Sequence, residues 1–147
     1  MITLRFVTAD DIISAGIRAA EYGFWASHVE CLTSDNTLLG AHVDGGVQAR
    51  KRDYDTGKFT KEEFVNLPLN NTMTTKFLEF LNNQIGKPYD LSAITAFVVG
   101  RNWRETDSWF CSELQAAALE NSGWFNTLAT EVNHITPRDL RLIISGR

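Results

Sequence analysis

Two cysteines and three histidines are the residues of this chain best suited to covalent or metal chemistry. Two cysteines cannot form a disulfide scaffold or a four-cysteine metal site, so a thiol would have to work together with His, Asp or Glu. Cys111 is the stronger candidate nucleophile, because Asp107 or Ser108 can cap a helix that begins just before it. The free N–H groups and the positive dipole at a helix start favour a thiolate. The competing interpretation is a buried structural cysteine, a common fate of free thiols.

His28 lies in an expected strand, residues 24–32, that is rich in aromatic and β-capable residues. Alternation along a strand puts its ring on the same face as Glu30 and puts Cys31 on the opposite face. An imidazole on a strand, held against a thiol on a helix, is the base and nucleophile pair of cysteine hydrolases. A structural histidine is the competing interpretation. His42, near the end of the next strand, can reach the outer nitrogen of His28 across a hairpin and fix its tautomer.

Zinc sites are weaker alternatives. The run His28-Val29-Glu30 matches half of a zinc deaminase signature, but Cys111 lacks the second cysteine that the other half requires. Four residues have suitable ligand types without the short paired spacing of zinc sites, namely His28, His42, Cys111 and Glu113. We therefore expect no metal and no cofactor. Glu113 is expected to face solvent, and His134, which has no comparable neighbourhood, to be structural.

Apolar spacing and turn residues predict the elements that position these side chains. The expected helices run from Asp10 or Asp11 to about Tyr22, from Asn71 or Thr72 to about Ile85, and from Asp107 or Ser108 to about Asn121. The expected strands are 24–32, 37–43, 47–50 and 64–69, with a charged, mobile stretch at 51–63. The apolar run 91–99 fits either a helix or a strand, and a final apolar run covers 140–144. This grouping predicts an α+β fold with a mostly antiparallel sheet.

Several short motifs, spread from residue 27 to residue 137, carry a resemblance to a known family. They are Ser27-His28-Val29, Gly45-Gly46-Val47, Gly86-Lys87-Pro88-Tyr89-Asp90, Trp109-Phe110-Cys111-Ser112-Glu113-Leu114 and Thr136-Pro137. Together they resemble the circularly permuted papain-like cysteine hydrolases of the NlpC superfamily, in particular the YiiX-like branch, with the lecithin:retinol acyltransferase group as a more distant relative. The resemblance implies a permuted papain-like domain over residues 1–147, with the nucleophile helix packed against an antiparallel sheet.

The same resemblance implies that Cys111 is the nucleophile and His28 the general base of an amidase-like or peptidase-like enzyme. In relatives a polar residue of the second strand directly precedes a small residue, and Gly40 ahead of Ala41 holds that position here. Gly40 cannot orient an imidazole, so His42 is the substitute third catalytic residue. The expected reaction is attack on an amide or ester carbonyl through an acyl-enzyme, with acyl transfer as a variant. The alternative is an inactive or weak member of the fold that binds a peptide, a lipid or a protein.

Length and charge limit the remaining classes of function. The 147 residues suit one domain, and a net charge of −4 lacks the basic footprint of most nucleic-acid binders. No apolar run approaches the roughly 20 residues that cross a bilayer, and Asp10 and Asp11 interrupt the region where a signal peptide would be apolar. We therefore expect a cytoplasmic protein without a membrane span. Its expected substrate is an amide or ester in a peptide, a peptidoglycan fragment or an acyl lipid.

Overall fold

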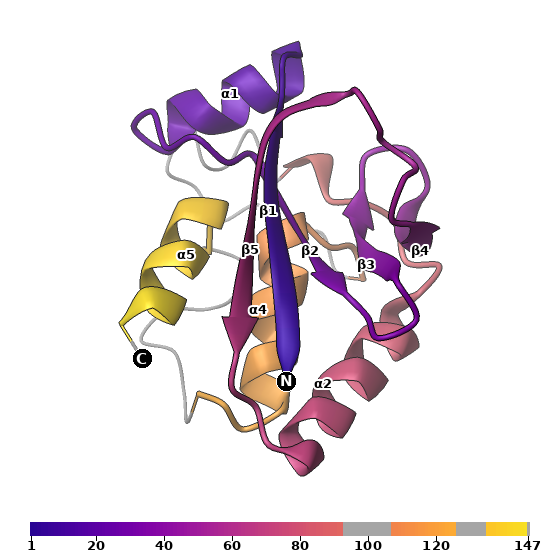
Figure 1. Ribbon diagram of the computed structural model, residues 1–147. Coiled ribbons are helices and arrows are strands. Elements are labelled where there is room, and N and C mark those ends of the chain that lie inside the picture. The colour runs from indigo at the N-terminus through magenta and orange to yellow at the C-terminus, as the bar shows by residue number, and fades with distance from the viewer. Residues whose placement is uncertain (93–106, 126–134, 147) are drawn as a thin grey trace.

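The computed structural model, which describes residues 1–92, 107–125 and 135–146, has an α+β architecture built on one antiparallel sheet (Figure 1). The strand order is β4-β3-β2-β1-β5, and the strands are β1 (Ile2–Ala9), β2 (His28–Leu32), β3 (Thr37–His42), β4 (Gly46–Lys51) and β5 (Phe59–Leu67). The described helices are α1 (Ile12–Ala20), α2 (Asn71–Gln84), α4 (Cys111–Asn121) and α5 (Pro137–Ser145). The expected α+β class and antiparallel sheet are confirmed.

β1 is the strand that the sequence patterns above leave unassigned, although it lies inside the sheet between β2 and β5. Leu4 and Phe6 are fully buried in the apolar core, while Arg5 between them pairs with Glu30 of β2 on the opposite face. Both faces of β1 are therefore covered, and a strand buried on both faces lacks the clean apolar–polar alternation that identifies a half-exposed strand.

Two strand expectations change in detail, and two are confirmed. β2 begins at His28, so the expected start at Phe24 is wrong by four residues. β5 begins at Phe59, so the expectation of a mobile stretch up to Glu63 is wrong from Phe59 onward. The strands predicted at 37–43 and 47–50 are confirmed, because β3 and β4 form a hairpin whose register pairs Ala41 with Val47.

Two helices follow the sequence prediction closely. Asp11 caps α1, with its carboxylate accepting the N–H of Ser14 at 2.8 Å. Asn70 caps α2, with its amide oxygen accepting the N–H of Met73 at 2.9 Å, one residue before the expected cap. The final apolar run belongs to a helix, α5, whose cap is Thr136. Most of the ambiguous run 91–99 lies outside the described residues.

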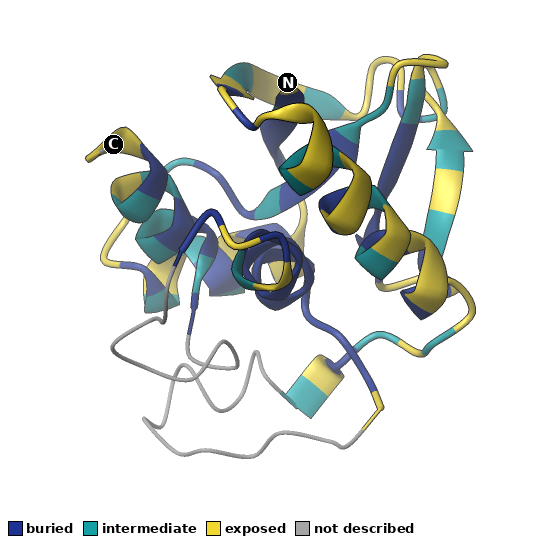
Figure 2. Ribbon diagram, turned by 90° about the horizontal axis from the view of Figure 1, so that it is seen from below, coloured by how far each residue is buried: buried dark blue, intermediate teal, exposed yellow. Residues whose placement is uncertain are grey.

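The apolar core lies between the sheet and helix α4, which has α5 and α2 on either side of it (Figure 1). All nine residues from Cys111 to Leu119 are buried, as the dark blue of the central helix in Figure 2 shows. The α4 helix packs against β2 and β3, and Gln115 Nε2 donates a hydrogen bond to the Leu39 carbonyl at 3.1 Å. This packing brings the start of α4 to β2. Within the described residues, no helix is long and apolar enough to span a membrane.

The opposite face of the sheet is charged and lies beneath the segment between β4 and β5. Asp55 of this segment is almost fully buried, and its carboxylate accepts a hydrogen bond from Arg5 Nη1 at 2.8 Å. The Tyr54 ring makes an edge contact with the His42 ring, with centroids 5.5 Å apart. The segment therefore shields polar groups of β1, β2 and β3 from solvent.

Candidate active site

Cys111 is the first residue of α4, so its thiol lies at the helix start as the sequence predicts. The cap residue is Phe110, and the expectation that Asp107 or Ser108 caps this helix is wrong. Glu113 Oε2 accepts the Phe110 N–H at 3.1 Å and is buried, which corrects the expectation that Glu113 faces solvent. Placing a carboxylate in the first turn complements the helix dipole and fixes the backbone that carries the thiol.

His28 begins β2, and its side chain interacts with Cys111 on one side and Glu30 on the other. Burial lowers the pKa of His28, but the interaction with Cys111 and the negative charge of Glu30 outweigh it and raise the pKa to about 10. His28 Nε2 lies 3.6 Å from Glu30 Oε2. Because Nε2 faces the carboxylate, Nδ1 is the ring nitrogen that remains for the thiol.

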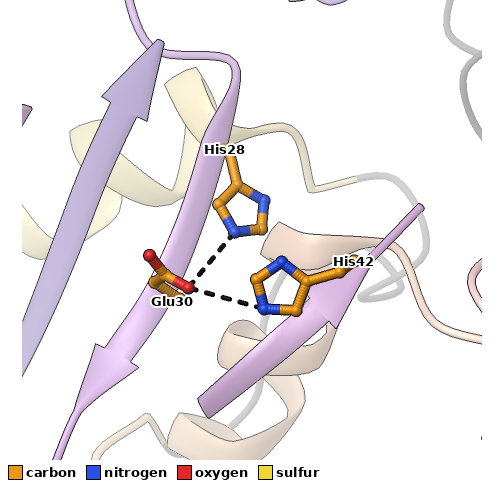
Figure 3. A group of neighbouring side chains, drawn as sticks. All are labelled: His28, Glu30 and His42. Carbon is orange, nitrogen blue, oxygen red and sulfur yellow. Dashed lines mark ion pairs between the residues drawn. The ribbon is translucent and has the colours of Figure 1, made fainter. Parts of the chain in front are cut away.

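Glu30 is a candidate site residue that the sequence patterns do not reveal. Its side chain is fully buried, and Oε1 accepts a hydrogen bond from Arg5 Nη1 at 3.0 Å. The other oxygen, Oε2, faces both imidazoles, as Figure 3 shows. The sequence signal for this contact is the two-residue spacing between His28 and Glu30, because residues i and i+2 of a strand share a face.

Gly40 explains how a carboxylate on β2 can occupy this place. A Cβ atom at Gly40 would lie 2.9 Å from Glu30 Cβ, closer than such atoms approach in proteins. The glycine therefore leaves room for Glu30 on the neighbouring strand. Gly40 itself has no side chain that could orient His28, but it lies next to Glu30, whose carboxylate faces His28.

His42 lies beside His28, with ring centroids 5.0 Å apart. Its Nε2 is 3.5 Å from the same Glu30 oxygen that faces His28 (Figure 3). Burial, followed by the charges of His28 and Arg50, lowers the pKa of His42 to about 2, so this imidazole is neutral. The structure thus brings together all three residues proposed from the sequence, Cys111, His28 and His42, and adds Glu30 between the two imidazoles.

A pocket of about 510 Å³ opens beside the histidines, and His28, His42 and Tyr89 form part of its wall. Cys111 does not line this pocket and is fully buried. Burial, then the charges of Cys111, Glu113 and Asp90, raise the pKa of the Tyr89 hydroxyl well above its usual range. Both Tyr89 and His28 therefore line the pocket and interact with the thiol.

Cys31 occupies the other face of β2, as predicted from strand alternation. It is fully buried in the apolar core and pairs with Leu4 of β1. Burial and the nearby negative charge of Glu30 raise the pKa of this thiol to about 12, so it stays protonated at neutral pH. His134 lies outside the described residues.

Thiol, imidazole and carboxylate follow one another in the order Cys111, His28, Glu30, an arrangement that can activate a thiol as a nucleophile. No protein-family model matches the chain, and no curated protein matches it significantly. The functional argument therefore depends on the chemistry of these side chains.

Proposed function

We propose that this protein is a cysteine hydrolase with a permuted papain-like fold of the NlpC type, and that it cleaves amide or ester bonds. The observation that carries the proposal is the position of His28, which interacts with the Cys111 thiol at a helix start and with the buried Glu30 carboxylate behind it. Substrates that fit this chemistry are peptides, peptidoglycan fragments and acyl lipids, with acyl transfer as a variant of the same reaction.

Because the pKa of His28 is raised, its Nδ1 already holds the thiol proton in the resting site, and the reaction begins when the Cys111 thiolate forms a bond from Sγ to the carbonyl carbon. The carbonyl π electrons move to oxygen, and the first-turn N–H groups of α4, which have no acceptor within the helix, stabilise the oxyanion. Collapse of this intermediate breaks the bond to the amine or alcohol, which leaves with the proton held by His28. A water molecule, deprotonated by His28, then attacks the thioester carbonyl. The C–S bond breaks, the carboxylic acid leaves, and the Cys111 thiolate is restored beside the protonated His28.

Glu30 acts in this scheme as a positioning residue for His28. Its Oε1 is held by Arg5, and this contact directs Oε2 toward His28 Nε2. A carboxylate there keeps Nδ1 directed at the thiol and stabilises the imidazolium formed during the reaction. His42 contacts the same carboxylate oxygen and lines the pocket, so its place in the reaction is on the substrate side of Glu30.

Replacing Glu30 tests this role. Glu30→Gln keeps the size of the side chain and is expected to lower kcat by at least about tenfold with little change in KM, because substrate contacts are unaffected. Glu62→Gln is the matched control, since Glu62 contacts Arg5 Nε at 2.9 Å without facing His28. Equal loss of kcat in both variants would mean that Glu30 supports only the fold.

Alkylation by iodoacetamide tests the thiol itself, with Cys31 as an internal control. Cys111 is expected to react at least about tenfold faster than Cys31, whose raised pKa keeps it protonated. His28→Ala is expected to reduce this difference, because the thiol then has no base. Mass spectrometry of peptides separates the two sites. Equal alkylation of both cysteines would argue strongly against the proposed pair.

A second candidate function is binding without efficient catalysis, and the complete burial of Cys111 favours it. In that case the pocket beside His28 would hold a peptide, a lipid or a protein segment that is not cleaved. Cys111→Ala separates the two functions. An enzyme loses its turnover in this variant while substrate binding persists, whereas a binding protein keeps its full biological effect.

A further inference from the structure

Three side-chain atoms converge at one point on the charged face of the sheet: His28 Nε2, His42 Nε2 and Glu30 Oε2. We refer to His28, Glu30 and His42 as the imidazole–carboxylate cluster (Figure 3). All three atoms are shielded from solvent, and none of them makes a hydrogen bond. Buried polar atoms without a partner are rare, because each costs about 1–3 kcal/mol. The cluster therefore requires an explanation beyond packing.

The spacing of these atoms fits a shared cation better than direct contact. The two nitrogens lie 3.6 Å and 3.5 Å from Glu30 Oε2, longer than a normal hydrogen bond. Ligands at about 2.0–2.1 Å from a tetrahedral metal are separated from one another by roughly 3.4 Å. The three ligand atoms all lie within 4.8 Å of one another, so only the two imidazoles have to approach further.

We propose that the imidazole–carboxylate cluster binds one divalent transition-metal cation of the zinc type, held by His28 Nε2, His42 Nε2 and Glu30 Oε2. Two imidazoles and one carboxylate form a ligand set typical of zinc, and three protein ligands leave a position open to water or another ligand. Hard cations such as Mg²⁺ prefer oxygen ligands and do not fit this set.

The surroundings of the cluster also suit a cation. Arg5 holds the remaining Glu30 oxygen, as the outer partners of metal-binding carboxylates do. The same guanidinium is shared with Asp55 and Glu62, at 2.8 Å and 2.9 Å. The Arg5 guanidinium therefore faces three carboxylates, and these four side chains together carry a charge of 1 − 3 = −2.

A regulatory consequence rests on the proposed hydrolase function. A metal on His28 Nε2 leaves the remaining proton of the neutral ring on Nδ1, the nitrogen that faces the thiol. His28 then has no lone pair with which to accept the Cys111 proton. Zinc binding is therefore expected to inhibit hydrolysis reversibly, and a chelator is expected to restore it.

Direct binding to metal-free Cys111→Ala is the first test, because this variant keeps all three ligands and removes the competing thiolate. Titration with Zn²⁺ against a chromophoric chelator should show one ion per chain with a micromolar or lower Kd, and Mg²⁺ should not compete. Adding His42→Ala or Glu30→Gln should weaken binding at least about tenfold. Adding Asp44→Asn, a nearby pocket residue outside the cluster, should not.

Thermal unfolding provides a second readout, since a ligand that binds only the folded state raises its Tm. Zn²⁺ should raise the Tm of Cys111→Ala and should raise it less once His42 is also replaced, with His42→Asn used if the alanine variant does not fold. No Zn²⁺ binding to folded Cys111→Ala would overturn the proposal, as would equal affinity in the His42 and Asp44 variants.

The wild-type protein separates this inference from the proposed function. Zinc binding by Cys111→Ala, together with no hydrolysis by the metal-free wild type, would uphold the metal site and reject the hydrolase. Hydrolysis by the wild type that 100 equivalents or so of Zn²⁺ leave unchanged, with no binding to Cys111→Ala, would overturn the metal site alone.

Discussion

The two faces of β2 differ sharply in their chemistry, although the strand has only five residues and successive side chains point to opposite faces. Val29 and Cys31 enter an apolar core against α4, while His28 and Glu30 enter a charged layer beneath the segment between β4 and β5. Both layers are buried. The apolar layer gains free energy from removing surface from water, whereas the charged layer depends on every charge finding a partner.

The apolar face of β2 therefore contributes mainly to stability, while the charged face carries the side chains proposed for chemistry. Burial and the charge of Glu30 raise the pKa of Cys31 and keep this thiol protonated, while Cys111 lies at a helix start beside an imidazole. The charged layer holds Glu30 at a cost in desolvation that Arg5 offsets. We make four quantitative predictions from this difference, the first of which compares Cys111 with Cys31.

The largest effect is expected from replacing Cys111, the proposed nucleophile. Cys111→Ser should reduce hydrolysis of a p-nitrophenyl ester by at least about 10³-fold, because a hydroxyl beside His28 is a far weaker nucleophile. Cys31→Ala is the matched control and should keep most of the activity while it lowers the free energy of unfolding. Steady-state kinetics on the folded fraction checks both. A similar loss of activity in the two variants would remove the distinction between the faces.

Arg5 is expected to give the largest change in stability. Arg5→Met leaves the fully buried Glu30 without its guanidinium and should lower the free energy of unfolding by about 3–5 kcal/mol. Arg141→Met breaks an ion pair with Glu63 whose side chains are 27% and 37% exposed, and should cost less than about 1 kcal/mol. Urea denaturation measures both values. Equal values would show that burial does not govern the charged layer.

Glu21 is a buried carboxylate outside β2, and it tests how burial acts on an acid. Its Oε1 accepts the backbone N–H of Arg138 at 2.8 Å, but burial raises its pKa to about 7. Because the folded pKa exceeds the usual value of 4.5, its stabilising contribution is complete below pH 4.5 and is lost as pH rises through 7. The free energy of unfolding should fall by about 3 kcal/mol over that range.

Glu21→Gln should flatten this part of the stability profile, and urea denaturation between pH 5 and pH 8 measures it. The amide keeps the shape of the side chain and does not ionise. A profile that keeps its slope in the variant would assign the pH dependence to other groups.

Two glycine replacements, one in a strand and one in a helix, should change the free energy of unfolding least and with opposite signs. Gly40→Ala places a methyl group 2.9 Å from Glu30 Cβ and should destabilise the fold by about 1–3 kcal/mol. Gly16→Ala, inside α1 with no atom within 4 Å of the new methyl group, should stabilise it by about 0.5–1 kcal/mol. Thermal melts distinguish the signs. A neutral Gly40→Ala would mean that Glu30 does not need the cleared space.

Sequence patterns predict those features of the fold that depend only on residues close together in the chain. Asp11 and Asn70 cap helices whose apolar spacing is visible in the sequence, and Cys111 was placed at a helix start. The strand alternation that separated His28 from Cys31 was equally local. These features depend on neighbours within about one turn or one pleat.

The parts that sequence could not predict depend on contacts between distant segments. β1 is hidden because both of its faces are covered, and Glu30 gains its role from Arg5 on β1 and from the absence of a side chain at Gly40 on β3. The sequence predicts that Glu113 faces solvent, yet Glu113 is buried in the first turn of α4, the helix that packs against β2 and β3. Such cross-strand and cross-layer pairs follow only from the register of the sheet.

Trapping the acyl-enzyme tests the central claim most directly. The protein is mixed briefly with p-nitrophenyl acetate in the presence of a chelator, quenched in acid, digested and examined by mass spectrometry. We predict one acetyl group on Cys111 and none on Cys31, with much less acetylation in His28→Ala. Acetylation absent from Cys111, or present equally on Cys111 and Cys31, would contradict the assignment of Cys111 and His28 as the reacting pair.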